Sequence, residues 1–256
     1  MDCERAGGYI GDDPSDLAKD YPIVEIFHSV QGEGYHAGIP HVFVRFGTCN
    51  LRCSWCDTDF DTFESMNAID VLSEIMQYDC DRIIFTGGEP MLHDLWPLHR
   101  LLKRRGYNLS IESNGTIEIP EGLIDWICIS PKDQVYPNSV IRQRIGQELK
   151  VVYCGQEMDM YNDLRSGFDH HFIQPCYIDT ASVEENGVLF QNTEQIVKSI
   201  EVGDYHYRHT NGWGFYENSG YGTKWRHGFY MSLDALSCSK LSSNMHFILL
   251  WPEAFD

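Results

Sequence analysis

Short apolar runs rich in β-branched and aromatic residues recur along the chain as far as residue 175. Runs of this kind, bounded by glycine, proline and asparagine, are typical of β-strands with one or both faces buried. We therefore predict strands over residues 22–30, 41–47, 81–85, 107–113, 124–130, 148–153 and 170–175.

Between these runs, apolar residues repeat every three or four positions, which is the spacing of one helix face. Residues 67–78 carry such a stripe, and residues 94–106 carry another that ends in basic residues and Gly106, both suited to a helix C-terminus. Shorter helices are predicted over 158–167 and 193–202. Strands separated by helices imply right-handed crossovers and an α/β fold with a mostly parallel sheet, either doubly wound or curled into a partial barrel.

The two ends of the chain lack this periodicity. Residues 1–20 are rich in glycine, aspartate and proline and are predicted to form a flexible tail, with order beginning near Tyr21. Residues 203–256 are aromatic and punctuated by glycine without a clear period, so we predict an irregular C-terminal extension there. One main domain is expected over residues 21–202.

Composition narrows the range of ligands. The chain has 256 residues, 43% of them apolar, which is enough for a sizeable core, and its formal net charge is −19. That charge disfavours binding to nucleic acid or to an anionic membrane, so we expect a small-molecule ligand. Nine cysteines, the lack of a leader-like apolar start and the lack of a run of about 18 apolar residues lead us to expect a cytoplasmic protein with reduced thiols.

Polar and glycine-containing motifs follow four of the predicted strands directly. They are TGGEP at 86–90, SNG at 113–115, SPK at 130–132 and QP at 174–175. Parallel α/β sheets and barrels bind their ligands at the carboxyl ends of their strands, so these motifs are expected to share one mouth.

Three cysteines with the spacing CNLRCSWC, Cys49, Cys53 and Cys56, follow the second strand. Thiolates favour zinc, copper(I) or iron with sulfide, and a structural zinc site needs four ligands. One alternative is therefore a zinc knuckle closed by His41 or His36. The other is a [4Fe-4S] cluster held by three thiolates, with its fourth iron open to a ligand.

The cysteine spacing and the motifs that follow it resemble the radical S-adenosylmethionine superfamily. The resemblance implies a partial (β/α) TIM-like barrel in which the open iron binds the methionine part of S-adenosylmethionine. It also implies roles for residues of the GGEP, ESN and SPK motifs. The residues expected to bind this cofactor are Gly88, Glu89, Glu112, Asn114, Ser130, Pro131 and Lys132.

Residues 25–60, with QGEG, RFGTCNL and CDTDF, resemble the 7-carboxy-7-deazaguanine synthase family more specifically, and the resemblance runs to about residue 176. It implies conversion of 6-carboxy-5,6,7,8-tetrahydropterin to 7-carboxy-7-deazaguanine with loss of ammonia, in queuosine biosynthesis. It also implies a magnesium ion bound by Thr58. The residues expected to bind the pterin are Val30, Gln31, Gly32, Glu33, Arg45, Thr86, Gln174, Pro175, Cys176 and Tyr177.

The chemistry of these residues agrees with such a substrate. Arg45 presents a rigid donor fork suited to a carboxylate, and magnesium commonly takes few protein ligands besides substrate and water. The resemblance further implies an external flavodoxin-like electron donor and a homodimer. Two other functions remain open at this point: a radical activating enzyme that takes hydrogen from a glycine of a partner protein, and a zinc-stabilised binding module.

Overall fold

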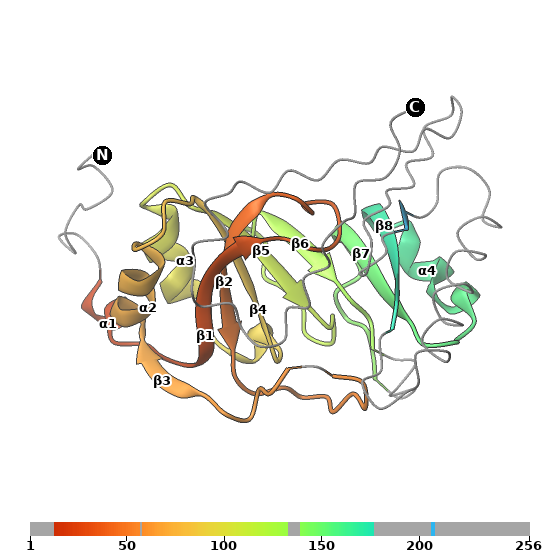
Figure 1. The fold of residues 1–256 in the computed structure, drawn as a ribbon, viewed down its shortest axis with the longest axis horizontal. Coiled ribbons are helices and arrows are strands. Elements are labelled where there is room, and N and C mark those ends of the chain that lie inside the picture. Colours follow the sequence, from red (N-terminus) through yellow and green to blue (C-terminus); the bar gives the residue numbers. More distant parts are fainter. Residues whose placement is uncertain (1–12, 57, 133–138, 177–205, 208–256) are drawn as a thin grey trace, which may run out of the picture.

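A computed structural model describes residues 13–56, 58–132, 139–176 and 206–207 (Figure 1). Within them the strands form one sheet in the order β3-β1-β2-β4-β5-β6-β7-β8-β9. The strands are β1 (Asp20–Val30), β2 (Pro40–Phe46), β3 (Glu64–Asn67), β4 (Arg82–Gly87), β5 (Asn108–Ser113), β6 (Trp126–Ile129), β7 (Gly146–Tyr153), β8 (Phe168–Pro175) and β9 (His206–Tyr207). The α-helices are α1 (Pro14–Leu17), α2 (Ala68–Ile75), α3 (Trp96–Lys103) and α4 (Asn162–Arg165).

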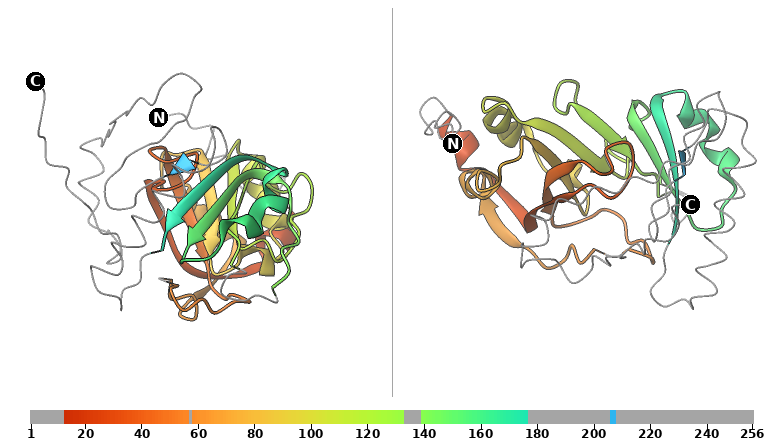
Figure 2. Two further views of the ribbon diagram at one scale, coloured as in Figure 1. Left: turned by 90° about the vertical axis from the view of Figure 1, so that its right-hand side faces the viewer. Right: turned by 45° about the horizontal axis from the view of Figure 1, so that its top comes forward.

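The sheet combines an antiparallel edge with a parallel body. β1 pairs antiparallel with β2 and β3, and every neighbouring pair from β2–β4 to β8–β9 is parallel. Figure 2 shows this sheet curving while its two edges stay apart. The α/β prediction is confirmed, with the geometry of an open, partial barrel. None of the helices in the described part of the chain is long and apolar enough to cross a membrane.

The two faces of the sheet differ in chemistry because successive side chains of a strand point to opposite sides. One face is the apolar core, where Val44, Phe85 and Ile111 are fully buried together with the apolar faces of α2 and α3. The opposite face, which we call the inner face, includes polar residues that share a register across the strands. They are Arg45, Thr86, Glu112, Cys128, Glu148 and Lys150.

The predicted flexible tail was too long, because residues 13–20 are ordered. Asp13 caps α1 with its side chain, and Pro14 occupies the first helical position. The Asp16 carboxylate is buried and receives two hydrogen bonds from the Arg100 guanidinium on α3, with Nε 2.6 Å from Oδ2. This long-range ion pair holds α1 against α3, and a pairing over 84 residues leaves no local signature in the sequence.

Other differences are local. β3 was not predicted, because ESMN is short and polar and is ordered by pairing with β1 at the sheet edge. The predicted helix over 158–167 divides into a 3-10 turn at Met158–Tyr161 followed by α4. The helix predicted over 193–202 lies outside the described residues, as does the 203–256 extension apart from β9.

The Asp16–Arg100 pair predicts an asymmetric effect on stability. Arg100→Ala leaves a buried carboxylate without its donors and is expected to lower the free energy of unfolding by about 1–3 kcal/mol. Asp16→Ala leaves a half-exposed guanidinium that water can solvate, so its cost should be about 1 kcal/mol or less. Chemical denaturation checks both, with Lys103→Ala as the control because its ion pair with Asp125 is exposed. Equal costs for the two substitutions at the Asp16–Arg100 pair would contradict this account.

Candidate functional site

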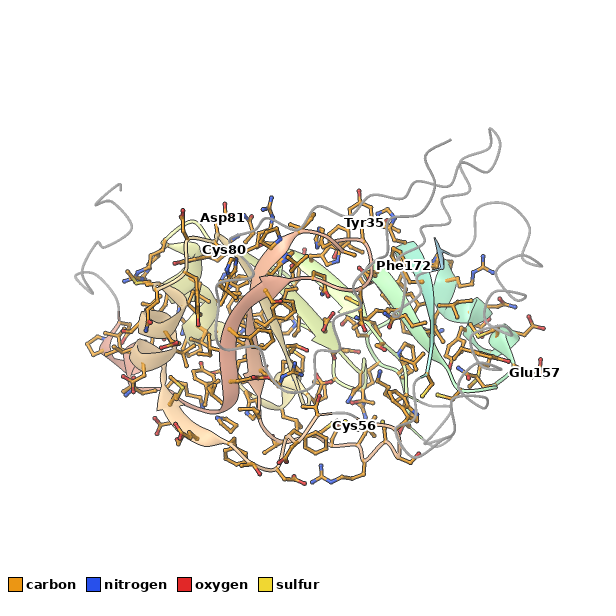
Figure 3. The ribbon with its side chains drawn as sticks, in the orientation of Figure 1. Tyr35, Cys56, Cys80, Asp81, Glu157 and Phe172 are labelled. Atoms are coloured by element: carbon orange, nitrogen blue, oxygen red, sulfur yellow. The ribbon has the colours of Figure 1, made fainter. Side chains whose placement is uncertain are left out.

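The cysteine loop lies at the carboxyl end of β2, on the edge where the parallel strands end. Figure 3 shows Cys56 on the opposite side of the molecule from Asp81, the residue just before β4, so β4 runs toward the cysteines. Cys49 and Cys53 are half-buried, Cys56 is exposed, and all three are free thiols. The predicted metal ligands thus occupy the mouth to which the strand-end motifs also point.

The GGEP motif holds the start of this loop by backbone hydrogen bonds. Gly88 N–H donates to the Phe46 carbonyl and Glu89 N–H donates to the Thr48 carbonyl, both at 2.9 Å. A Cβ at Gly88 would lie 1.7 Å from the Thr48 carbonyl oxygen, so only glycine permits this approach. Thr48 itself has a φ of 67°, a left-handed conformation that these contacts hold in place immediately before Cys49.

Glu89 links the same motif to the SNG turn after β5. Its buried carboxylate accepts hydrogen bonds from Ser113 Oγ at 2.9 Å and from Asn114 N–H at 2.8 Å. Burial raises the pKa of Glu89 in spite of these donors. Asn114 Nδ2 in turn donates to Asn50 Oδ1 at 2.9 Å inside the cysteine loop. Hydrogen bonds therefore connect the GGEP motif, the SNG turn and the cysteine loop, which are distant from one another in the sequence.

The SPK motif after β6 reaches the cysteine loop from the other side. The Lys132 ammonium donates to Ser130 Oγ at 2.7 Å and lies 4.9 Å from the centre of the Trp55 ring. Burial lowers the pKa of Lys132. Trp55 Nε1 is buried and has no hydrogen-bond partner among the described residues, so a donor remains available beside Cys53. Pro131, which lies between Ser130 and Lys132 in the sequence, is also buried.

The cysteine thiols need a bound cation, and His41, considered above as a fourth zinc ligand, does not reach them. Burial raises the pKa of Cys49 and raises that of Cys53 to about 11, so a bound cation is needed to keep them as thiolates. His41 is the second residue of β2 and lies on the order of 16 Å from the strand's end at about 3.3 Å per residue, so it cannot complete a site with the cysteines. Among the described residues, no group of three or more Cys, His, Asp and Glu side chains is arranged to hold a metal ion.

Glu112 is the centre of a buried polar network on the inner face. Its carboxylate accepts from Lys150 Nζ at 2.8 Å and from Gln31 Nε2 and Thr86 Oγ1, both at 3.1 Å. Burial alone would raise the pKa of Glu112, but the Lys150 charge and these donors lower it to about 2. The structure therefore places Glu112 with the predicted pterin-binding residues, although the sequence motif associates it with the cofactor.

The QGEG loop after Val30 crosses this inner face. Glu33 pairs with Lys150 at 2.8 Å, and Tyr35 N–H donates to Glu148 at 3.1 Å. Gly34 has a φ of +65°, and a Cβ there would lie 1.8 Å from a Glu148 carboxylate oxygen. Val30 ends β1 and Gly32 is half-buried within the loop, so this predicted group does assemble over the strands.

Arg45 and Thr58, predicted to bind the substrate carboxylate and magnesium, lie in contact. Arg45 Nη1 donates to Thr58 Oγ1 at 3.2 Å, and Arg45 Nε donates to Glu25 at 2.8 Å. The guanidinium carbon is 5.8 Å from the centre of the Phe27 ring. The β2 arginine is thus fixed at the boundary between the inner face and the cysteine loop.

The end of β8 contributes a buried amide. Gln174 is 5% exposed, and its Nε2 has no hydrogen-bond partner among the described residues. Cys176 is buried directly after Pro175, the last residue of β8. Tyr177 lies outside the described residues, so its predicted contact with the pterin stays a prediction.

Three charged residues of the site were missed by the sequence analysis: Glu25, Glu148 and Lys150. The strand ELKVVY offered a signal, because Glu148 and Lys150 alternate with apolar residues in a strand expected to be covered on both faces. Charges there are costly unless they are paired, so they point to an internal polar face. Glu25 alternates in the same manner along β1.

Comparisons with known proteins agree with this geometry. The model of the Radical SAM superfamily matches residues 43–132. The 7-carboxy-7-deazaguanine synthase of Bacteroides thetaiotaomicron is 41% identical over 167 residues, covering 65% of this chain and 88% of the relative. That of Neisseria meningitidis is 41% identical over 182 residues, covering 66% and 84%. The crystal structure of QueE from Escherichia coli superposes with a TM-score of 0.55 at 26% identity, covering 70% of this chain and 91% of that one.

The close approach at Gly88 predicts a specific defect in cluster retention. Gly88→Ala forces the Thr48 carbonyl away and should lower the iron bound per chain after anaerobic reconstitution several-fold, while the fold persists. Iron and sulfide analysis with circular dichroism measures this. Gly106→Ala is the control, since a Cβ there meets nothing within 4 Å and its φ of +79° costs only about 1 kcal/mol. Full iron loading of Gly88→Ala would refute the proposed packing.

Proposed function

Because this chain belongs to the 7-carboxy-7-deazaguanine synthase family, we propose that it is a radical S-adenosylmethionine lyase that converts 6-carboxy-5,6,7,8-tetrahydropterin to 7-carboxy-7-deazaguanine with loss of ammonia, a step of queuosine biosynthesis. The observation that carries this proposal is the adjacency of two groups. A loop with three free cysteines is fixed by the GGEP backbone, and it borders an inner face of buried hydrogen-bonding side chains.

The cysteine loop would hold the [4Fe-4S] cluster through Cys49, Cys53 and Cys56. When bound, the cluster and S-adenosylmethionine supply the one-electron chemistry that removes a hydrogen atom from the substrate. The residues proposed to line the nucleotide are Gly88, Glu89, Asn114, Ser130, Pro131 and Lys132. Two of these support the loop from opposite sides: Asn114 through Asn50, and Lys132 through Trp55.

The inner face would bind the pterin. A pterin edge presents several N–H groups, and the carboxylates of Glu33 and Glu112 are acceptors for them, while Thr86 fixes Glu112. The buried amide of Gln174 offers a donor that the described residues leave unused. The loop from Gln31 covers part of this face and limits the access of water, which strengthens the hydrogen bonds beneath it.

Arg45 and Thr58 would bind the carboxylate end of the substrate, with magnesium on the threonine hydroxyl. In the present geometry the Arg45 guanidinium already donates to this hydroxyl. A divalent cation placed beside a guanidinium is repelled unless an anion lies between them. We therefore propose that magnesium binds well only together with the substrate carboxylate, which contacts both cations.

An electron donor, an oligomeric state and a cellular location are proposed together with this reaction. Reduction of the cluster needs an external donor, for which a small flavodoxin-like protein is proposed. A homodimer and a cytoplasmic location are also proposed, the latter supported by the seven free cysteines of the described residues. The substrate is small, so neither nucleic acid nor membrane is needed as a partner.

The function is tested by an anaerobic assay of the reconstituted protein with the tetrahydropterin, S-adenosylmethionine and a reductant. Formation of 7-carboxy-7-deazaguanine and ammonia is expected, with a rate that rises when magnesium is added. Turnover of S-adenosylmethionine without any pterin product would refute the proposal and direct attention to a radical activating enzyme. Colourless protein that retains zinc would instead support a binding module.

Thr58→Val is expected to abolish the response to magnesium, because the variant keeps the shape of threonine without its oxygen. The rate with magnesium should fall to the level of the wild-type protein without it. Thr58→Ser, which keeps the hydroxyl, should retain most of the response. The measurement is a magnesium titration of the rate, together with binding of manganese(II) followed by its magnetic resonance signal. A wild-type magnesium response in Thr58→Val would show that the hydroxyl is not the ligand.

Arg45→Met is expected to lower kcat/KM for the pterin by about 10- to 100-fold, since hydrogen bonds to charged groups contribute roughly 1.5–3 kcal/mol. Arg45→Lys keeps the charge but loses the planar fork, so its loss should be intermediate. Arg82→Met serves as the control because Arg82 begins β4, at the other end of the strand from the site, and is exposed. An Arg45→Met enzyme with unchanged kcat/KM would remove Arg45 from the carboxylate site.

A further inference from the structure

Lys150 lies in the middle of β7, and its ammonium is almost completely enclosed. The side chain is 6% exposed, and Nζ is 2.8 Å from both Glu33 Oε2 and Glu112 Oε1. These partners come from the loop after β1 and from β5, which are 117 and 38 residues away in sequence. A buried lysine is costly unless it is paired, so the two carboxylates account for its place in the strand.

Lys150 and its two carboxylate partners each keep the other in the charged form. Burial would lower the pKa of Lys150, but Glu112 and Glu33 raise it well above its ordinary value, so the ammonium stays charged. The same contact keeps the partly buried Glu112 carboxylate, whose side chain is 23% exposed, in its ionised form. An ionised carboxylate can only accept hydrogen bonds, whereas a protonated one presents a donor on one oxygen.

We infer that Lys150 is a positioning residue that holds Glu112 and Glu33 as oriented, ionised acceptors for the N–H edge of the pterin. This inference rests on the proposed function. Two of the three Nζ–H donors of Lys150 are engaged by these carboxylates, and Arg45 supplies the cation for the substrate carboxylate elsewhere on the inner face. Lys150 therefore acts through its two partners, without contact with the reacting atoms.

Other titratable groups surround this network. Glu148 lies two residues before Lys150 on β7, Cys128 on β6 faces it, His41 approaches from β2, and Lys132 from the strand end. Burial raises the pKa of Glu148 and of Cys128, and lowers that of His41 and of Lys132. Each of these shifts favours the uncharged form. Of the three side chains that donate to Glu112 in the described part of the chain, Lys150 is the cation.

The test is the pH dependence of kcat/KM for the tetrahydropterin. In Lys150→Met the pKa of Glu112 rises, because the charge that lowered it is gone, and Glu112 becomes protonated as the pH falls. We expect a new loss of kcat/KM on the acid side, at a pH at least one unit above any acid limb of the wild-type enzyme. At alkaline pH the variant should recover toward the wild-type value. Lys150→Arg should keep the wild-type profile, as should Lys103→Met, the matched control on α3.

A second variant guards against a simple failure to fold. Lys150→Met with Glu33→Gln removes one buried negative charge together with the ammonium, yet leaves Glu112 without its cation, so the acid shift should persist. In Glu112→Gln, adding Lys150→Met should cause no further acid shift, since the titrating carboxylate is absent. Reconstituted cluster absorbance and thermal unfolding establish that each variant is intact.

The outcomes separate the two hypotheses. If the wild-type enzyme makes no deazaguanine, the proposed function fails. If the wild type is active and an intact Lys150→Met loses activity equally at every pH, Lys150 does not act through the ionisation of Glu112, and the inference is overturned. The inference is also overturned if the Glu33→Gln form of Lys150→Met shows no acid shift relative to Glu33→Gln alone. Unchanged activity of Lys150→Met at every pH would overturn it as well.

Discussion

The site depends on one close approach of two backbones. β4 ends at Gly87 and is followed by Gly88, and the missing side chains of these two glycines let the chain come within hydrogen-bonding distance of the Phe46 and Thr48 carbonyls. These two bonds hold the start of the loop that carries the three cysteines. Glu89 then extends the same contact to β5 by accepting from Ser113 and Asn114. The ends of β2, β4 and β5 and the start of the cysteine loop are thus joined by a few atoms.

The sheet separates two kinds of chemistry by the simple alternation of its strands. Phe85 faces the apolar core while its neighbour Thr86 faces the polar network, and Ile111 and Glu112 divide in the same manner. The apolar face is stabilised by burial against α2 and α3. The inner face must instead pair its most deeply buried polar groups, such as the Lys150 ammonium, because an unpaired buried charge is costly. A register slip of one residue in β5 would therefore exchange the two environments and disrupt both.

Much of this arrangement was predictable from sequence, because the relevant signals are local. Apolar runs predicted the strands from β1 to β8 except β3. Motifs directly after strands predicted that the site lies at the carboxyl ends of the parallel strands. The contacts between side chains that are far apart in the sequence were not predictable. Glu112 was assigned by its motif to the cofactor, yet its neighbours Gln31 and Lys150 are brought to it by loop and strand packing. Asp16 lay in a segment that looked like a tail, and its contact with Arg100 on α3 helps to order that segment. Pairings of this kind depend on the completed fold.

The anchoring of the cysteine loop has an energetic consequence of its own. Thr48 is held by Phe60 and Glu89, Asn50 by Asn114, and Trp55 by the Lys132 ammonium, all through groups of the protein itself. The conformational entropy of these residues is therefore lost when the chain folds, and little remains to be lost when iron and sulfide arrive. Ordering of the cysteine loop would thus precede loading of the metal, which would favour tight retention of a cluster by the three cysteines proposed as its ligands.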